Sequence, residues 1–387
     1  MSVIYFDHAA TTPPHEDVLA AMIPLLRENF GNPSSIHALG QAARAAVDSA
    51  REKVAALIGA SPSEIAFTSG GTEANNIAIF GTAVPASRET GRNHIVTSAI
   101  EHHSVFDACH VLEGRGFDVT YLPVDRLARV DPEQVRKAIT DRTCLVSIMF
   151  ANNEVGTIQP VAEIAAICVE RGVPFHTDAV QGAGNVPLDV SKLPVQMLSL
   201  SGHKFYGPKG AGALFVRSGV RLEALVHGGG QERGIRPGTE NVPGIVGLGE
   251  AAAVAARELP QRLAHVSALR DRLIREIPRR VSQASLTGDP QNRLPGLASF
   301  HIDGVEGESL LVALDLEGIA ASSGSACALG ALESSHVLRA MGFSDSQARG
   351  HLRLSLGRSN TNEELDRLLE VLPAIMERLR RLAAPAP

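Results

Sequence analysis

The sequence predicts an α/β protein with a large domain built on a mainly parallel sheet and a smaller α+β domain. Over residues 16–256, short apolar runs alternate with helical patterns, which is typical of a parallel sheet covered by helices on both faces. Beyond about Glu258 this alternation stops. A chain of 387 residues also exceeds the usual size of a single core. We therefore expect a large domain over residues 14–257 and a small domain formed by residues 1–13 and 258–387.

Helix boundaries carry clear signals. A long helix from Gln41 ends at Gly59, because glycine accepts the left-handed conformation that often terminates a helix. Segment 61–64 marks another helix start or a turn, and 131–132 places an aspartate cap before a first-turn proline. The last helix opens with the capping box 361–364.

The small domain is expected from a different pattern. A helix containing Leu263 and Ile274 leads to a strand near 297–302, and a half-buried strand is expected over 352–356. The tail 383–387, rich in alanine and proline, should be disordered. The sequence has no internal repeats.

One predicted strand ends in reactive side chains. The apolar run 195–200 leads directly to Ser201, His203 and Lys204. A lysine amine held at the end of a buried strand is partly desolvated and can attack a carbonyl group, which suits an enzyme that uses pyridoxal phosphate (PLP). The neighbouring hydroxyl and imidazole can bind the phosphate of that cofactor. Lysine-containing turns also follow strands for purely structural reasons, so this segment is not specific alone.

A second signal precedes the first in the chain. The apolar run 173–175 leads to Asp178 and Gln181. PLP withdraws electrons effectively only while its pyridine nitrogen is protonated, and a paired aspartate keeps it so. A lone aspartate can equally cap the next turn. Because Asp178 and Lys204 both follow strands, where ligands bind in open α/β sheets, the cofactor interpretation is favoured.

A glycine-rich turn supplies a third signal. The strand 65–68 runs into Gly70, Gly71 and Thr72 at the start of a helix. Glycines let backbone N–H groups approach an anion, and a helix N-terminus carries partial positive charge. The turn is therefore a candidate phosphate site, although such turns are also common without a ligand. It is not a Walker loop, because no Gly-Lys-Ser/Thr follows.

Composition excludes several classes of protein. The net charge of −6, without a basic patch, argues against a nucleic-acid partner. The basic cluster 378–381 is interpreted as the solvated face of a terminal helix. No apolar stretch approaches the roughly 20 residues of a membrane span, and residues 1–5 do not resemble a signal peptide. We expect a cytoplasmic protein without a membrane partner.

The four cysteines fall into two groups. None belongs to a Cys-x-x-Cys pair, so neither a metal site nor a disulfide framework is indicated. Cys144 and Cys168 lie in apolar segments, and Cys109 is similar, so we expect inert core residues. Cys327 is flanked by serine, glycine and alanine without periodicity, which predicts a mobile, accessible loop.

In their order and spacing, these motifs resemble the cysteine desulfurase family of NifS/IscS type, within the PLP-dependent transferases of aspartate aminotransferase fold. The likeness extends from 5–12 to 353–358 and is most specific at 322–327. Three further segments share it: 30–35, 152–156 and 227–232. The resemblance implies a homodimeric enzyme that converts L-cysteine to L-alanine and keeps the sulfur as a persulfide.

The resemblance assigns the central roles. Lys204 would hold PLP as a Schiff base and later move the Cα proton of the substrate. Asp178 would keep the pyridine nitrogen charged, and Gln181 would hydrogen-bond the phenolic oxygen. Cys327 would attack the substrate sulfur as a thiolate and carry it to an acceptor.

Two further roles have neighbouring competitors. His102 matches the family histidine that stacks on the cofactor ring and assists proton transfer, but His103 lies beside it. Asn153 matches a residue near cofactor and substrate, with Asn152 adjacent. In both pairs the choice depends on the resemblance alone.

The phosphate would be bound by Ser201, His203, Thr72 and the backbone of Gly71. Thr239 matches a family threonine that reaches the phosphate of the neighbouring subunit, which implies a homodimer with shared active sites. Residue 237 is proline where the family pattern has serine, and this puts the local backbone geometry in doubt.

Arg353 is the candidate anchor of the substrate carboxylate. A planar guanidinium binds a carboxylate through two parallel hydrogen bonds, which lysine cannot do. The alternative is a surface salt bridge. An arginine within the half-buried strand 352–356 needs an anionic partner, and this favours the anchor.

Three other functions fit parts of the pattern: a selenocysteine lyase of the same fold, an aminotransferase, and a PLP-binding scaffold without catalysis. An aminotransferase would need no cysteine on a mobile loop, and a scaffold would need neither Lys204 nor Cys327. The sulfur acceptor is open. An iron–sulfur scaffold protein, with transient cluster contact at Cys327, is expected, but the tail after Met376 lacks the longer extension with which housekeeping family members dock one.

Overall fold

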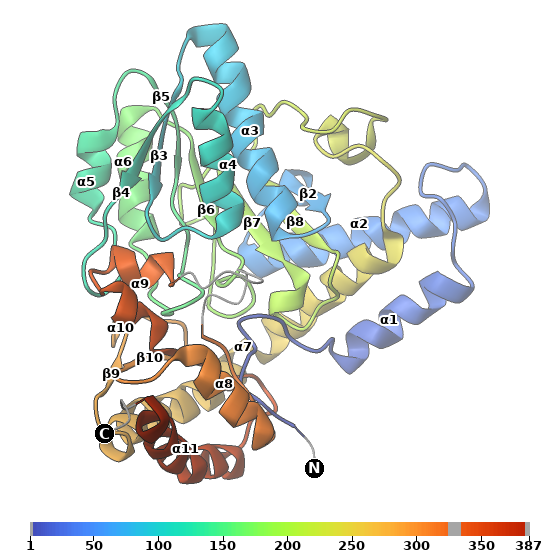
Figure 1. Ribbon diagram of the computed structural model, residues 1–387. Helices are drawn as coiled ribbons and strands as arrows, with labels where there is room; N and C mark the ends of the chain where they lie inside the picture. The colour runs from blue at the N-terminus through green and yellow to red at the C-terminus, as the bar shows by residue number, and fades with distance from the viewer. Residues whose placement is uncertain (1–2, 324–333, 384–387) are drawn as a thin grey trace.

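The computed structural model describes residues 3–323 and 334–383. Within them a seven-stranded sheet has the order β2-β8-β7-β6-β5-β3-β4 (Figure 1). Its strands are β2 (Ile65–Thr68), β3 (His94–Ser98), β4 (Asp118–Leu122), β5 (Thr143–Ser147), β6 (Phe175–Asp178), β7 (Met197–Ser201) and β8 (Gly212–Val216). Five neighbouring strands of this sheet, in the order β7-β6-β5-β3-β4, are parallel, which confirms the predicted α/β class with a mainly parallel sheet. β8 runs antiparallel to β7 and β2, because its short connection from β7 leaves no room for a crossover helix.

Helices cover both faces of this sheet, because alternate residues of each strand point to opposite sides. One face packs against α3 (Gly71–Thr90) and α4 (His103–Glu113) through residues such as Leu214. The other packs through residues such as Phe215 against α2 (Ala38–Ile58), α6 (Val161–Arg171) and the first half of α7 (Val242–Arg280). The remaining helices of this part are α1 (Glu16–Arg27) and α5 (Pro132–Ala138).

The expected helix ends are present. Gly59 follows α2 with a φ of 68°, in the left-handed region. The Asp131 side chain accepts a hydrogen bond from the Glu133 amide at the start of α5. Segment 61–64 forms a single 3₁₀ turn, η1 (Pro62–Glu64), closed by a capping box. A second capping box, in which Thr361 and Glu364 bond each other's backbone N–H groups, precedes α11 (Asn362–Ala383).

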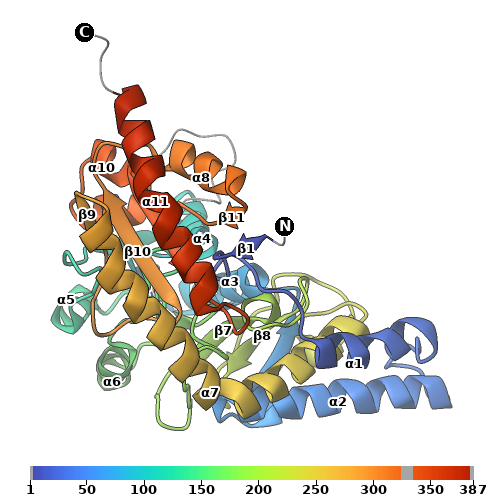
Figure 2. The ribbon, with the colours of Figure 1, turned by 90° about the horizontal axis from the view of Figure 1, so that it is seen from below.

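A second core lies around a three-stranded antiparallel sheet in the order β12-β10-β9. Its strands are β9 (Ala284–Leu286), β10 (Leu297–Ile302) and β12 (His351–Ser355). Around it lie α8 (Gly307–Leu316), α10 (Asp345–Arg349) and α11, which lies alongside the second half of α7 (Figure 2). α9 (His336–Ala340) packs in a smaller apolar cluster with Ile100 and Met149 of the large domain. The N-terminal arm joins this core: β1 (Ile4–Tyr5) pairs with β11 (Ile319–Ala320), and Phe6 is fully buried in it.

α7 belongs to both cores. Its residues up to Ala255 pack against the large sheet, and those from Val266 to Ile277 pack in the second core. The helix continues without interruption past residue 257, where we expected the domains to divide. No helix among the described residues is long and apolar enough to cross a membrane. The tail segment 384–387 lies outside the described residues.

Candidate active site

The carboxyl ends of β6 and β7 and the N-termini of α3 and α4 open into one hollow of about 1100 Å³. It brings together nearly all the residues singled out in the sequence: Gly71, Thr72, His102, Asn153, Asp178, Gln181, Ser201, His203, Lys204 and Arg353. Two candidates are not among the residues that line this hollow in the described part of the chain. Thr239 lines a separate hollow, and Cys327 lies outside the described residues.

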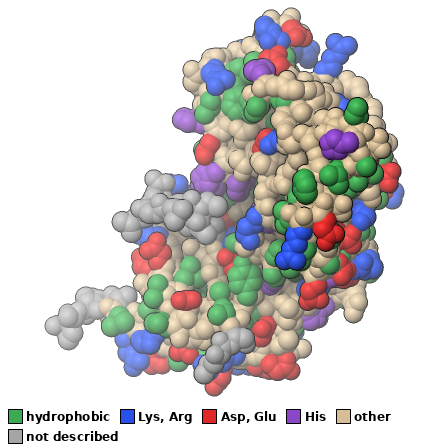
Figure 3. All heavy atoms as spheres, turned by 90° about the vertical axis from the view of Figure 1, so that its right-hand side faces the viewer, with side chains coloured by type: hydrophobic (Ala, Val, Ile, Leu, Met, Phe, Trp, Pro, Cys, Tyr) green, Lys and Arg blue, Asp and Glu red, His purple; other side chains and the backbone are tan. Residues whose placement is uncertain are grey.

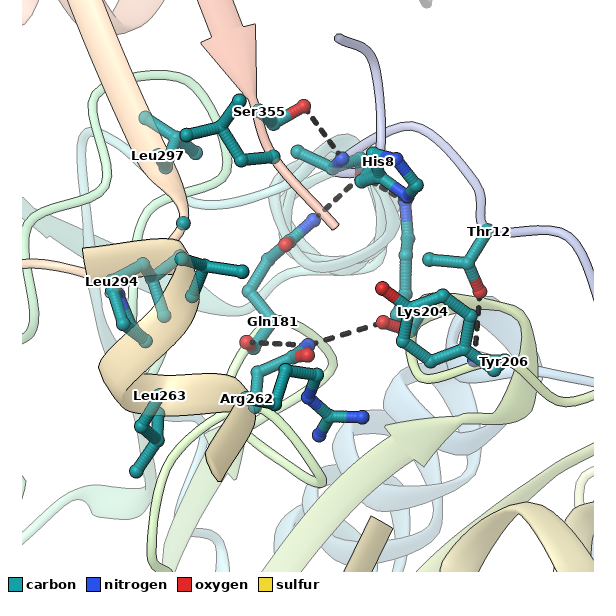
Figure 4. Close-up of a pocket in the computed structure, with 16 residues that line it drawn as sticks. His8, Thr12, Gln181, Lys204, Tyr206, Arg262, Leu263, Leu294, Leu297 and Ser355 are labelled. Atoms are coloured by element: carbon teal, nitrogen blue, oxygen red, sulfur yellow. Dashed lines mark hydrogen bonds between the residues drawn. The ribbon is translucent and has the colours of Figure 1, made fainter. Parts of the chain in front are cut away.

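Lys204 ends the 3₁₀ turn η2 (Gly202–Lys204) that follows β7. Its Nζ donates hydrogen bonds to the carbonyl oxygens of Ala9 (2.7 Å) and Ala10 (2.8 Å). Gln181 Nε2 donates to the same Ala9 oxygen at 3.0 Å. Figure 4 shows a smaller neighbouring hollow, where the Lys204 side chain extends toward the segment that carries His8. The N-terminal arm therefore holds the amine between the two hollows.

Asp178 is the last residue of β6 and is buried. Its Oδ1 accepts from the Val180 amide (2.9 Å), so the turn-capping interpretation is correct for this oxygen. Its Oδ2 accepts from Asn75 Nδ2 at 2.7 Å. Asn75 Nδ2 also donates to Ser104 Oγ (2.8 Å), which in turn contacts His102 Nδ1 (2.8 Å). A continuous polar network thus connects the carboxylate to the imidazole.

His102 and His103 are clearly distinguished. His102 precedes α4, and its Nδ1 accepts a hydrogen bond from the Ser104 amide (3.1 Å). Burial lowers the pKa of His102, with Asp178 opposing and Lys204 reinforcing the shift, so the ring is neutral and carries its proton on Nε2. His103 is half exposed, approaches Asp107 and packs against His336 with ring centroids 5.1 Å apart. Of these two neighbouring histidines, His102 lines the hollow and His103 does not.

Asn152 and Asn153 are also distinguished by their hydrogen bonds. Asn152 is buried, and its Oδ1 accepts from the Glu154 and Val155 amides while its Nδ2 donates to the Ile100 carbonyl. Its polar atoms are therefore used in shaping the turn. Asn153 lines the hollow instead.

Arg353 is 3% exposed, so the salt bridge that it forms with Asp7 is buried and does not lie at the surface. Asp7 thus supplies the anionic partner that a buried arginine needs. Its Nη2 donates to Asp7 Oδ1 (2.7 Å), and its Nη1 donates to the Asn153 carbonyl (3.0 Å). Its Nε is buried without a hydrogen-bond partner among the described residues. The guanidinium is thus held by two contacts and retains donor capacity toward an anion.

The start of α3 is suited to a phosphate. No side chain in the described part of the chain caps this helix, so its first amide groups are available. A Cβ at Gly71 would lie 2.5 Å from Val180 Cγ2, which shows why a glycine is needed here. Beside it stands Ser201, together with His203, whose pKa is lowered to about 4 by burial and then by Lys204 and Lys209. With a buried carboxylate at Asp178, this donor set fits PLP.

Thr239 is exposed on a loop beside the start of α3. The hollow that it lines measures about 570 Å³ and also contains Ser69, Glu232 and Arg236. Pro237, the departure from the family pattern, is buried in this loop. Thr239 does not enter the hollow that holds Lys204.

Comparisons with known proteins show the family to which the chain belongs. The family model for class-V aminotransferases matches residues 4–368. A "Cysteine desulfurase IscS" of Methanosarcina thermophila is 52% identical over 99% of this chain and 94% of its own length, and one of Dictyoglomus turgidum is 50% identical over 98% and 96%. A solved "NifS-like protein" superposes with a TM-score of 0.91 at 40% identity, covering 97% of this chain and all of that one. The chain therefore belongs to the cysteine desulfurase family within the class-V aminotransferases, a family that implies PLP.

Three residues of the site had no role in the sequence interpretation: Asn75, Ser104 and Asp7. Asn75 lies one helical turn after Thr72, and this spacing was an available signal. Asp7 lies within the N-terminal segment that resembled the family. Its contact with Arg353 joins distant parts of the chain, so spacing could not predict it.

Proposed function

We propose that this protein is a PLP-dependent cysteine desulfurase, which converts L-cysteine to L-alanine and retains the sulfur as a persulfide on Cys327. The observation that carries the proposal is the convergence of Lys204, Asp178, His102 and Arg353 on one hollow beside an uncapped helix N-terminus. Its relatives, which share about half of its sequence, support the same activity.

The site residues would divide the binding of PLP among them. Asp178, oriented by Asn75, would pair with the pyridine nitrogen, and the neutral ring of His102 would stack on the cofactor. The start of α3, with Thr72, Ser201 and His203, would bind the phosphate. When bound through Lys204, PLP supplies an electron-withdrawing ring that stabilises negative charge next to the substrate amine.

The remaining steps belong to the side chains. Arg353 binds the carboxylate of cysteine and fixes its orientation. The Lys204 amine takes the Cα proton. The Cys327 thiolate bonds to the substrate sulfur while the carbon–sulfur bond breaks, and the electron pair stays with Cβ. Cβ then takes up a proton, equivalent to the one that the Cys327 thiol has lost, and Lys204 returns the proton to Cα, which completes alanine. Cys109, Cys144 and Cys168 do not compete, because burial raises the pKa of each thiol, to about 12, 11 and 12.

A homodimer is part of the proposal. Large apolar side chains are exposed at the end of the molecule formed by α1 and α2: Leu19, Ile23, Leu26, Phe30 and Ile36. This end points toward the viewer in Figure 3. A second copy would cover these residues, and Thr239 would then reach the phosphate of the neighbouring site.

The persulfide would be delivered to an iron–sulfur scaffold protein, with transient cluster contact at Cys327, or to another sulfur acceptor; the relatives' name IscS supports this class of acceptor. A cytoplasmic location belongs to the same proposal, and it accords with the free, buried thiols of the three described cysteines.

The test is to incubate the purified protein with L-cysteine and a thiol reductant and to measure alanine and sulfide. Equal amounts of both are expected. The protein should be yellow, and borohydride should abolish the visible absorption by fixing PLP to Lys204. Lys204→Ala should lose turnover. A colourless protein with full activity would refute the cofactor. Strict preference for selenocysteine would favour the lyase instead.

A further inference from the structure

The loop that carries Thr239 contains an unusual turn. Glu232 (φ 48°, ψ 39°) and Arg233 (φ 58°, ψ 29°) both adopt the left-handed conformation, followed by Gly234 (φ 79°). Two consecutive non-glycine residues in this region are unfavourable, because Cβ approaches the carbonyl oxygen. Such a turn persists only where its surroundings hold it in place.

Glu232 supplies most of that hold, and Arg233 adds one hydrogen bond from its Nη2 to the Ile65 carbonyl (2.7 Å). Its carboxylate is buried and accepts two hydrogen bonds from the Arg51 guanidinium of α2, each 2.7 Å, and a third from the Phe67 amide of β2 (2.8 Å). Arg51 also donates to the Ile65 carbonyl and lies 4.6 Å above the Phe67 ring. The Glu232 carboxylate thus binds both α2 and β2, and the Arg51 guanidinium binds both Glu232 and the Ile65 carbonyl. These contacts fix the turn against β2, the strand that leads into α3.

Arg236 follows this turn directly in the chain, so the position of the turn determines where Arg236 lies. Arg236 Nε donates to Glu73 Oε1 at 3.0 Å, in the first turn of α3. The other oxygen of Glu73 accepts from the Ser69 amide, directly before the glycines. A continuous series of contacts thus connects the buried ion pair with the start of α3.

We propose that Glu232 is a positioning residue for the phosphate end of the active site. Paired with Arg51, it holds the strained turn so that Arg236 braces Glu73 and the start of α3 takes the shape that receives a phosphate. The inference rests on the proposed function, because PLP supplies that phosphate, but the order of the loop can be measured without any cofactor.

The experiment compares Glu232→Gln with a matched control, Glu250→Gln. Glu250 pairs with Lys53 (2.6 Å), on the same helix as Arg51, and among the described residues it forms no hydrogen bond or ion pair with the loop 231–239. PLP affinity is measured by fluorescence titration, and backbone hydrogen exchange is measured on the full chain without PLP. Glu232→Gln should weaken PLP binding at least tenfold and speed exchange over 231–239 and 69–72. The control should change neither.

Two further variants separate positioning from general stability. Arg236→Gln breaks only the half-buried contact with Glu73, and it should weaken PLP binding similarly while the melting temperature stays near wild type. Adding Arg233→Gly to Glu232→Gln should restore part of the affinity, since glycine adopts a positive φ without strain, although the hydrogen bond from Arg233 to the Ile65 carbonyl is lost. A merely structural role would not give this rescue.

Wild-type PLP affinity and exchange in Glu232→Gln would overturn the inference, as would loss of affinity in Glu232→Gln without rescue by Arg233→Gly. If the wild-type protein bound no PLP, the proposed function would fail. The exchange of residues 69–72 would still decide whether Glu232 orders this segment.

Discussion

At the scale of single residues, hydrogen bonding decides which of two similar neighbours can act. Asn152 uses its amide to close a turn, which leaves Asn153 at the hollow. His102 has one ring nitrogen fixed by the Ser104 amide, while His103 faces outward. Composition and motif cannot separate such pairs, because either neighbour could bind the backbone amides that follow it, and only the fold shows which side chain lines the hollow.

Asn75 should matter for cofactor binding although it was not recognised in the sequence. Its hydrogen bond to the Asp178 carboxylate involves a charged group, and such bonds contribute about 1.5–3 kcal/mol. Asn75→Ala should therefore weaken PLP binding by roughly tenfold or more, measured by fluorescence titration. Asn93→Ala, a control at a partly exposed asparagine that does not line the hollow, should bind PLP normally. Equal affinities would mean that Asp178 does not need this support.

Arg353 is expected to anchor the substrate carboxylate. Arg353→Ala should raise the half-saturating cysteine concentration by about one or more powers of ten, because charge-assisted bonds of about 1.5–3 kcal/mol are lost. Turnover should fall as well, while PLP content stays near normal. Arg353→Lys should recover only part of the loss, since a point charge cannot copy the guanidinium fork. Unchanged kinetics in Arg353→Ala would direct attention to Arg358.

At the scale of elements, the strand ends and helix starts create the site. Lys204 and Asp178 follow neighbouring parallel strands, and α3 and α4 direct their N-termini at the same hollow. The chain order of apolar runs and turn signals predicts that the ends of β6 and β7 and the start of α3 converge, whereas the place of His102 at the start of α4 was expected from the resemblance alone. It could not predict that β8 is reversed or that α7 serves two cores, because strand direction and helix continuity depend on packing between distant segments.

The closeness of α3 to the turn after β6 gives a test at this scale. Gly71→Ala would place a Cβ 2.5 Å from Val180 Cγ2, so either the Val180 side chain or the helix start must shift. PLP affinity should fall by roughly tenfold or more, equivalent to about 1.4 kcal/mol. Gly114→Ala, at the end of α4, has ordinary space around its Cβ and a φ of −61°, and it should be neutral. Titration of PLP into both variants decides the matter.

At the scale of the whole molecule, several buried histidines link stability to pH. Burial lowers the pKa of His8, His176 and His203 to about 4 and that of His351 to about 3, below the ordinary 6.5. Between about pH 6.5 and 4 the unfolded chain binds more protons than the folded one, so stability should fall as pH falls. Burial raises the pKa of Glu101 to about 8, so this carboxyl group stabilises the folded protein as pH falls. Because four histidines have the opposite effect, we expect their contribution to be the larger one.

Urea unfolding at pH 7.5, 6 and 5 would measure this effect. The wild-type midpoint should fall steadily, and His351→Gln should reduce the dependence on pH. The exposed His110→Gln should leave it unchanged. A midpoint that does not change with pH over this range would contradict the account, because it would mean that the folded and unfolded chains bind equal numbers of protons.

The two cores and the N-terminal arm meet at the hollow, where Arg353 of the second core joins Asp7 of the arm and Asn153 of the first. The resemblance indicated which residues matter, but only the fold shows that three distant segments share one guanidinium. Cys327 completes the account chemically, and it lies outside the described residues.

The central claim is tested most directly by locating the sulfur after one turnover. The protein is exposed to L-cysteine without reductant, alkylated and digested, and its cysteine peptides are analysed by mass spectrometry. The account predicts one extra sulfur atom on the Cys327 peptide and none on those of Cys109, Cys144 and Cys168. Cys327→Ser should bind cysteine but gain no sulfur. Persulfide on a buried cysteine, or alanine formed by Cys327→Ser at the wild-type rate, would contradict it.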